Sequence, residues 1–201
     1  MTAARTEERL ALCDPAAVPH FRAALGRAQA YGTDAYVERD PWRTPQQQAE
    51  KVKAGFSQVL DSAHTHVEGG DPAHKHTMID HVTDARPGVV DTHCTCGARP
   101  ASRAIHLVST ARFYFAESPG LLPAFAVRVG AACLKEGLVT GVLYGPRSKD
   151  RETLLHWRDG IYPALKIAMW DERWNEAEIV FANGQKIGGC WDPLHGEWRP
   201  T

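Results

Sequence analysis

The chain has 201 residues and a mass of 22.1 kDa, enough for one domain that buries a substantial core. Its 23 Lys and Arg residues against 24 Asp and Glu residues leave a formal net charge of -1, without the basic excess typical of nucleic-acid-binding proteins. No apolar run reaches the roughly 20 residues that cross a bilayer. Residues 1–12 also lack the apolar stretch of a signal peptide, and five scattered cysteines are too few for a disulfide framework. We therefore expect a protein made in the cytoplasm that binds neither nucleic acid nor a membrane.

The first part of the chain alternates between helical and strand patterns. Apolar residues recur at helical spacing up to Gly32, and Thr44-Pro45 has the pattern of a helix N-cap followed by Pro at the first helical position. In chain order, the sequence predicts a helix at 15–31, a strand at 34–38 and a helix at 45–54.

Residues 61–100 show no periodicity and are rich in Gly, Pro, Asp and His. A loop of this length inside a domain is usually functional, tied by a metal or disordered. We interpret residues 65–100 as a long irregular insertion within a single domain that spans residues 1–201.

Regular patterns return after the insertion. In chain order, they predict strands at 103–108 and 112–116, a helix at 122–136, a strand at 138–144, helices at 151–157 and 162–170, and a strand at 178–181 that turns at Asn183-Gly184. Together with the first part of the chain, these elements predict a mixed α+β fold.

Ten histidines, six of them between positions 64 and 93, raise the question of a bound metal. Near the C-terminus, Asp192 precedes His195 by three residues. At this spacing a histidine can bind zinc while the carboxylate accepts a proton from the attacking water. An arginine that reaches the same site, such as Arg43, could stabilise a developing oxyanion.

The order of these residues resembles a pattern of zinc peptidases. The family comprises D-Ala-D-Ala dipeptidases and carboxypeptidases and the L-alanyl-D-glutamate endopeptidases of bacteriophage lysins. The similar segments are Trp42-Arg43-Thr44-Pro45, Gln47 or Gln48, Gly55-Phe56-Ser57, Leu60-Asp61-Ser62-Ala63-His64 and Trp191-Asp192-Pro193-Leu194-His195-Gly196-Glu197. The resemblance covers residues 15–64 and 101–198, and it implies a small antiparallel sheet flanked by helices, as in hedgehog domains and D-Ala-D-Ala peptidases.

The resemblance also implies roles for individual residues. His64 and His195 would be zinc ligands, and Asp192 would be the general base. Arg43 would polarise the scissile carbonyl, and Ser62 would support the site from behind the ligands. Two tryptophans, Trp191 and Trp198, flank the proposed ligand His195, where they could line the site.

The middle zinc ligand is where this chain departs from the family, which has an Asp seven residues after the first His. Asp71 has that spacing but follows Gly69-Gly70, and Asp80 has a more strand-like setting. The segment at 102–108 looks like the family's ligand-bearing strand with His106 in place of the Asp. We favour His106 and keep Asp80 and Asp71 as alternatives.

The insertion offers a second set of metal donors. His74, His76, Cys94 and Cys96 supply two imidazoles and two thiols, enough for a structural zinc site, although their spacing differs from that of zinc fingers. The alternative is a polar surface loop whose histidines bind nothing.

These features predict a zinc-dependent hydrolase that cleaves an amide bond in peptidoglycan stem peptides. By resemblance it would be an endolysin-like metallopeptidase of bacteriophage type, made in the cytoplasm and active in cell wall degradation after release. The alternative is a catalytically inactive, zinc-containing peptidase-like protein that binds a wall peptide or a protein partner.

Overall fold

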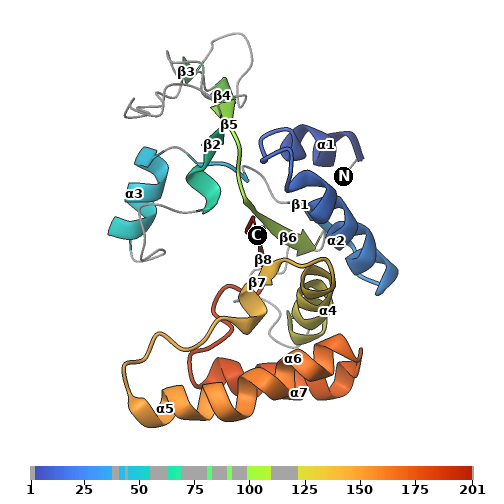
Figure 1. The fold of residues 1–201 in the computed structure, drawn as a ribbon, viewed down its shortest axis with the longest axis vertical. Helices are drawn as coiled ribbons and strands as arrows, with labels where there is room; N and C mark the ends of the chain where they lie inside the picture. The colour runs from blue at the N-terminus through green and yellow to red at the C-terminus, as the bar shows by residue number, and fades with distance from the viewer. Residues whose placement is uncertain are drawn as a thin grey trace.

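A four-stranded antiparallel sheet lies at the centre of the molecule (Figure 1). The structure is a computed structural model that describes residues 3–37, 41–43, 45–54, 63–68, 81–82, 90–91, 99–109 and 122–200. The strands run in the order β1 (Ala35–Val37), β6 (Ala104–Ser109), β8 (His195–Glu197) and β7 (Val139–Thr140). Strands from both ends of the chain therefore pair in one sheet, and the predicted α+β class is confirmed.

The two faces of this sheet differ in character because successive side chains of a strand point to opposite faces. Ile105 and Leu107 of β6 are fully buried in the larger of two apolar clusters. His106, between them, points to the other face and lies opposite His195 of β8 in the antiparallel register. The alternation in β6 thus separates a core-facing side from a histidine-bearing side.

Helices cover the apolar face. The first core combines residues of α1 (Ala3–Leu10), α2 (Val18–Ala30) and α4 (Leu122–Lys135) with β6. Pro19 lies in the first turn of α2, where its missing N–H costs nothing, and Gly32 takes a positive φ of 81° just after the helix. Pro19 and Gly32 therefore mark the start and the end of α2, and the apolar face of the helix between them packs against the sheet.

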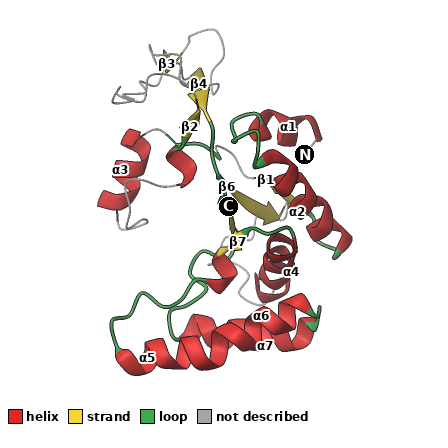
Figure 2. Ribbon diagram, in the orientation of Figure 1, coloured by secondary structure: helices red, strands yellow, loops and turns green. Residues whose placement is uncertain are grey.

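A second helical layer packs on the far side of α4. It consists of α5 (Arg151–His156), a π-helical turn η3 (Trp157–Ile161), α6 (Tyr162–Trp170) and α7 (Trp174–Lys186). Figure 2 shows α6 and α7 side by side below α4, and both helices contact it. Their buried residues form a second apolar cluster that includes Trp157, Leu165 and Phe181.

The remaining described elements lie around the insertion. They are α3 (Pro45–Lys53), the 3₁₀ turn η1 (Ala63–Thr65) and four two-residue strands. Strand β2 (Val67–Glu68) pairs with β5 (Arg99–Pro100), and β3 (His81–Val82) pairs with β4 (Val90–Asp91). The β2–β5 pair joins the two ends of residues 65–100, so this segment leaves the rest of the domain and returns to it at one place.

The structure confirms the helices predicted near 15–31, 45–54 and 122–136 and the strands near 34–38 and 103–108. The strand predicted at 178–181 is wrong, because this segment belongs to α7. Ala177, Phe181 and Gly184 are its buried residues, and their spacing is helical. Gly184 does not make a turn: a Cβ there would lie 2.9 Å from the Trp157 ring, so the glycine allows the helix to approach that ring.

The strand predicted at 138–144 is only partly right. β7 stops at Thr140, whose hydroxyl accepts a hydrogen bond from Val142 N at 3.3 Å and opens the 3₁₀ turn η2 (Gly141–Leu143). Helix α1 has no counterpart among the predicted elements, and the strand predicted at 112–116 lies outside the described residues. Among the described helices, none has the length and apolar character that crossing a membrane requires.

Candidate metal centre

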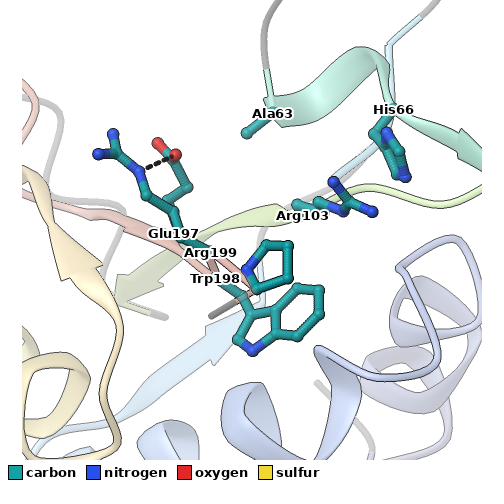
Figure 3. A pocket seen from close by; sticks show the side chains of 7 residues that line it. Ala63, His66, Arg103, Glu197, Trp198 and Arg199 are labelled. Atoms are coloured by element: carbon teal, nitrogen blue, oxygen red, sulfur yellow. Dashed lines mark hydrogen bonds and ion pairs between the residues drawn. The ribbon is translucent and has the colours of Figure 1, made fainter.

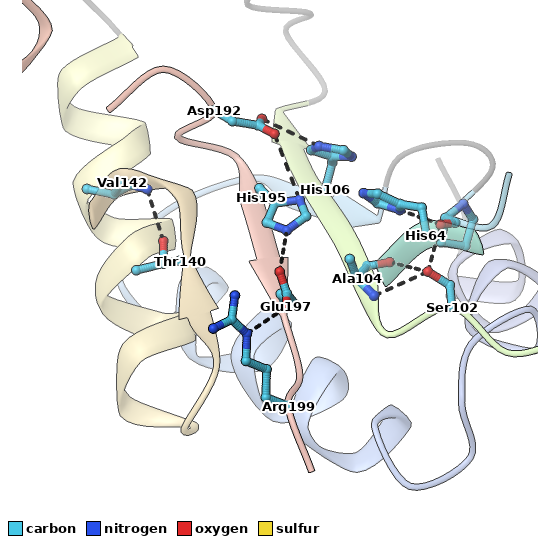
Figure 4. A network of polar contacts seen from close by, with 11 residues as sticks. His64, Ser102, Ala104, His106, Thr140, Val142, Asp192, His195, Glu197 and Arg199 are labelled. Atoms are coloured by element: carbon cyan, nitrogen blue, oxygen red, sulfur yellow. Dashed lines mark hydrogen bonds and ion pairs between the residues drawn. The ribbon is translucent and has the colours of Figure 1, made fainter. Parts of the chain in front are cut away.

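Two of the three central histidines meet through strand pairing. His106 and His195 are direct partners in the β6–β8 register, and their ring centroids lie 5.3 Å apart (Figure 4). Directly opposite residues on neighbouring antiparallel strands project to the same face with their Cβ atoms about 5 Å apart. The sheet therefore places these two imidazoles side by side.

The third histidine, His64, comes from η1, which backbone hydrogen bonds hold against the sheet. Arg43 N donates to His64 O at 2.9 Å, and Arg103 N donates to Ala63 O at 2.8 Å. These contacts bring the His64 ring into a nearly parallel stack with His106, with centroids 5.0 Å apart and planes 12° apart. The His64 and His195 rings meet edge to face at 5.3 Å.

A hydrogen bond fixes how the His64 ring is turned. Its Nδ1 donates to the carbonyl oxygen of Pro41 at 2.6 Å, and the side chain is only 2% exposed. The Ser102 hydroxyl lies 2.7 Å from the same carbonyl oxygen. A proton held on Nδ1 leaves the lone pair on Nε2, which is the usual arrangement of a metal-binding histidine.

The donor set fits a zinc ion. One nitrogen from each of His64, His106 and His195 can be chosen so that all lie within 4.8 Å of one another. The Nδ1 atom of His195 is buried and makes no hydrogen bond to the described residues, although a buried polar atom normally has such a partner. Three imidazoles are a donor set that zinc uses in hydrolytic sites. A metal ion would give the buried nitrogen the partner that the protein does not supply.

Burial prepares two of these rings to bind a metal. It lowers the pKa of His64 well below its ordinary value, and the neighbouring His106 and Arg43 charges lower it further. Burial also lowers the pKa of His195, against the opposing effect of Glu197. Both imidazoles are therefore neutral at pH 7, which is the form that binds metal.

Asp192 lies at the open side of the histidine group. Its carboxylate oxygens are 3.5 Å from Nε2 of His106 and 3.8 Å from Nδ1 of His195. Burial acts to raise the pKa of Asp192, but the hydrogen bond from His106 and the nearby charges of His106, His195 and Arg43 lower it overall. The carboxylate is thus ionised and can accept a proton beside the candidate metal ligands.

Arg43 approaches from the segment that holds η1. Its charge lowers the pKa of both His64 and Asp192, so the guanidinium lies within electrostatic reach of each. Its Nη1 lies 3.5 Å from the side-chain oxygen of Gln48, which is fully buried in α3. Helix α3 therefore supports the arginine beside the histidine group.

Glu197 is a member of the site that sequence reasoning did not assign. It is on β8 two residues after His195, so both side chains point to the same face. Its carboxylate lies 3.5 Å from His195 Nε2 and accepts a hydrogen bond from Arg199 Nε at 2.7 Å. These two contacts lower the pKa of Glu197 to about 2. The alternation of side chains in a strand through His195 is the signal that could have identified it.

A cavity of about 350 Å³ borders this group on the Glu197 side (Figure 3). Its charged and aromatic lining comes from His66, Arg103, Glu197, Trp198 and Arg199. Asp14 accepts a hydrogen bond from Arg103 Nε at 2.9 Å, so both arginines of the lining are held by carboxylates. Of the two tryptophans that flank His195, Trp198 lines this cavity, whereas Trp191 does not line it and is 41% exposed.

The structure brings together five of the residues predicted for the site. His64, His106 and His195 surround one point, Asp192 lies 3.5 and 3.8 Å from ring nitrogens of His106 and His195, and the backbone N–H of Arg43 donates to His64 O. The other predicted residues lie outside the described part of the chain: Ser62, the alternative ligands Asp71 and Asp80, and the candidate structural ligands His74, His76, Cys94 and Cys96.

Comparisons of the chain with protein-family models, with curated proteins and with solved structures find no match.

Proposed function

We propose that this protein is a zinc metallopeptidase that hydrolyses an amide bond in peptidoglycan stem peptides. The observation that carries the proposal is the group of three imidazoles around one point, with the ionised Asp192 carboxylate 3.5 and 3.8 Å from two of them. Hydrolytic zinc sites combine such a ligand set with a nearby base.

Each residue of the group would do a distinct part of the chemistry. A bound zinc ion would supply Lewis acidity, which makes water a nucleophile at neutral pH. Asp192 would accept the proton of the attacking water and return it to the leaving amine. Arg43 would hold the scissile carbonyl and balance the negative charge that develops on its oxygen.

The choice of peptidoglycan as substrate depends on the order of the motifs along the chain. Arg43, His64 and the Asp192-x-x-His195 pair follow the sequence in which the D-Ala-D-Ala and L-alanyl-D-glutamate peptidases carry their site. The position of Arg43 next to His64 also supports a peptidoglycan substrate, because the family's arginine acts at the scissile bond. The proposed place of action is the bacterial cell wall.

The first experiment is a zinc determination on protein purified without a histidine tag. One equivalent per chain that is lost in His64→Ala and His106→Ala supports the proposed centre. A second equivalent that is lost in Cys94→Ser would come from the insertion. Protein that takes up no zinc when the metal is added would contradict the proposal.

The second experiment tests the role of Asp192. Asp192→Asn is expected to lower turnover of muropeptides about 10²- to 10⁴-fold, the usual contribution of a general base, while zinc content is unchanged. Asp159→Asn is a matched control, because that carboxylate is exposed on η3 and, among the described residues, pairs with Arg158 alone. If wild type and Asp192→Asn bind muropeptides equally and neither cleaves them, the protein is a binding protein and not an enzyme.

A further inference from the structure

An arginine and a tryptophan form an exposed stack at the edge of the candidate metal centre. Trp191 directly precedes Asp192 and is 41% exposed. The Cζ atom of Arg147 lies 3.8 Å from the centroid of the Trp191 ring, close enough for direct stacking. The stack is therefore next to the proposed base.

The backbone holds this exposed tryptophan in place. Cys190, the preceding residue, has a positive φ of 53° and donates its backbone N–H to Tyr144 O at 2.8 Å. A non-glycine residue in this region is strained and persists only where its surroundings hold it, often at functional sites. The backbone position of Trp191 is therefore set by the fold.

An aromatic contact connects the stack to the metal ligands. The Tyr144 ring lies 5.0 Å from the Trp191 ring and 5.7 Å from the His195 ring. A row of rings thus runs from the ligand His195 to the Arg147 guanidinium. A group held by Arg147 would have a defined position relative to the scissile bond.

Arg147 differs from the other arginines around the centre in its charge balance. Arg103 is held by Asp14 and Arg199 by Glu197, whereas Arg147 has no ion pair with any described residue. A guanidinium that lies over an indole ring can keep N–H donors at its edge, where they match the two oxygens of a carboxylate. The stack thus presents a preoriented positive charge that no described residue balances by an ion pair.

We infer that Arg147 and Trp191 form a subsite that binds a carboxylate of the substrate. This inference depends on the proposed function and adds that the preferred substrate is an acidic peptide. A stem peptide supplies two such groups, the α-carboxylate of its γ-linked D-glutamate and its C-terminal carboxylate. The position of the stack beside Asp192 requires that the recognised carboxylate lie near the scissile amide.

The test uses a synthetic stem pentapeptide, L-Ala-γ-D-Glu-L-Lys-D-Ala-D-Ala, with each carboxylate amidated in turn. Binding is measured in zinc-loaded Asp192→Asn protein, and kcat and KM in otherwise wild-type protein. We expect one amidated peptide to bind about 10- to 100-fold more weakly than the free acid, as for loss of a hydrogen bond to a charged group. The amidated peptide that binds more weakly identifies the carboxylate that the protein recognises.

The variants assign this preference to Arg147. Arg147→Gln should remove the difference between acid and amide and raise KM with little change in kcat, whereas Arg151→Gln, at an exposed arginine of α5, should retain it. If the acid and both amides are cleaved equally by wild type, or if the preference survives Arg147→Gln, the subsite is disproved and the proposed function stands. If no peptide is bound or cleaved, the proposed function fails and the subsite fails with it.

Discussion

His195 uses its two ring nitrogens differently. Its Nε2 faces Glu197 at 3.5 Å, while its Nδ1 is buried and faces the other imidazoles and Asp192. A carboxylate on the outer nitrogen fixes the tautomer and the orientation of a metal-binding histidine and increases its basicity. Arg199 in turn holds this carboxylate through a 2.7 Å hydrogen bond.

Glu197→Gln is therefore expected to weaken zinc binding about 10-fold or more, within the range known for changes behind a metal ligand. Competition with a chromogenic chelator measures this dissociation constant. Glu178→Gln is the control, because Glu178 of α7 pairs with Arg128 at 3.1 Å and takes no part in the centre. Equal zinc affinity in wild type and Glu197→Gln would show that Glu197 does not support His195.

The turn that carries Asp192 and His195 lies directly against η2. An added Cβ at Gly141 would lie 1.7 Å from the backbone oxygen of Asp192 and 3.1 Å from His195 Cβ. No side chain fits at that distance, so the turn reaches the centre only because residue 141 is a glycine.

Gly141→Ala should displace this turn, lower zinc affinity at least 10-fold and abolish turnover, since misplaced ligands lose most of their binding. Calorimetric zinc titration together with circular dichroism separates loss of the site from loss of the fold. Gly26→Ala is the matched variant: it is within α2 with open space around it, and it should stabilise the protein by about 1 kcal/mol. Unchanged zinc affinity in Gly141→Ala would contradict the close packing.

Helix α5 starts directly after the loop that carries Arg147. Asp150 is its N-cap, and its carboxylate accepts a hydrogen bond from Thr153 N at 2.8 Å, which lowers the pKa of Asp150 in the folded protein. A carboxyl group whose pKa is lower when folded stabilises the protein above its unfolded pKa, and this contribution is lost as the pH falls through the folded pKa.

Asp150→Asn keeps a cap acceptor but removes this titration. Its melting temperature should therefore fall less than that of wild type when the pH is lowered from 6 to 3. Thermal unfolding followed by circular dichroism at both pH values measures the difference. An identical fall in both proteins would show that the cap does not contribute to acid sensitivity.

For the whole molecule, α4 connects the two apolar cores. Phe125 and Val129 belong to the core under the sheet, whereas Ala126 and Val127 of the same helix belong to the core with α6 and α7. The sheet that carries the candidate metal centre therefore shares a helix with the layer farthest from it. We expect both layers to unfold together.

Phe181→Ala tests this coupling from the far side of α4. Phe181 is fully buried, so its loss should cost about 3–5 kcal/mol through transfer and cavity terms. Urea unfolding should then show the same lowered midpoint by tryptophan fluorescence and by release of zinc. Zinc release at the wild-type midpoint, with fluorescence changing earlier, would mean that the two layers unfold separately.

Sequence patterns alone were enough to predict the α+β class, the long periodic helices α2 and α4, and the residue types of the site. His64 and Arg43 could be selected because the order of the motifs resembles that of a zinc peptidase family, and Asp192 and His195 also because their spacing suits a metal site. Such inferences succeed where the information is local. They fail for α7, because three consecutive β-branched or aromatic residues, Ile179, Val180 and Phe181, suggest a strand when the burial of the whole 13-residue segment is not known.

Which distant residues contact one another is known only from the folded structure. His106 lies 89 positions before His195 in the chain, and the antiparallel register of β6 and β8 places them opposite each other. The fold likewise brings Arg147 over the ring of Trp191, which follows the strained backbone of Cys190. These relations depend on strand register and on packing between distant segments. The spacing of residues along the chain does not specify which residues pair across strands. A strand that is shifted by two residues still turns the same apolar side chains toward the core.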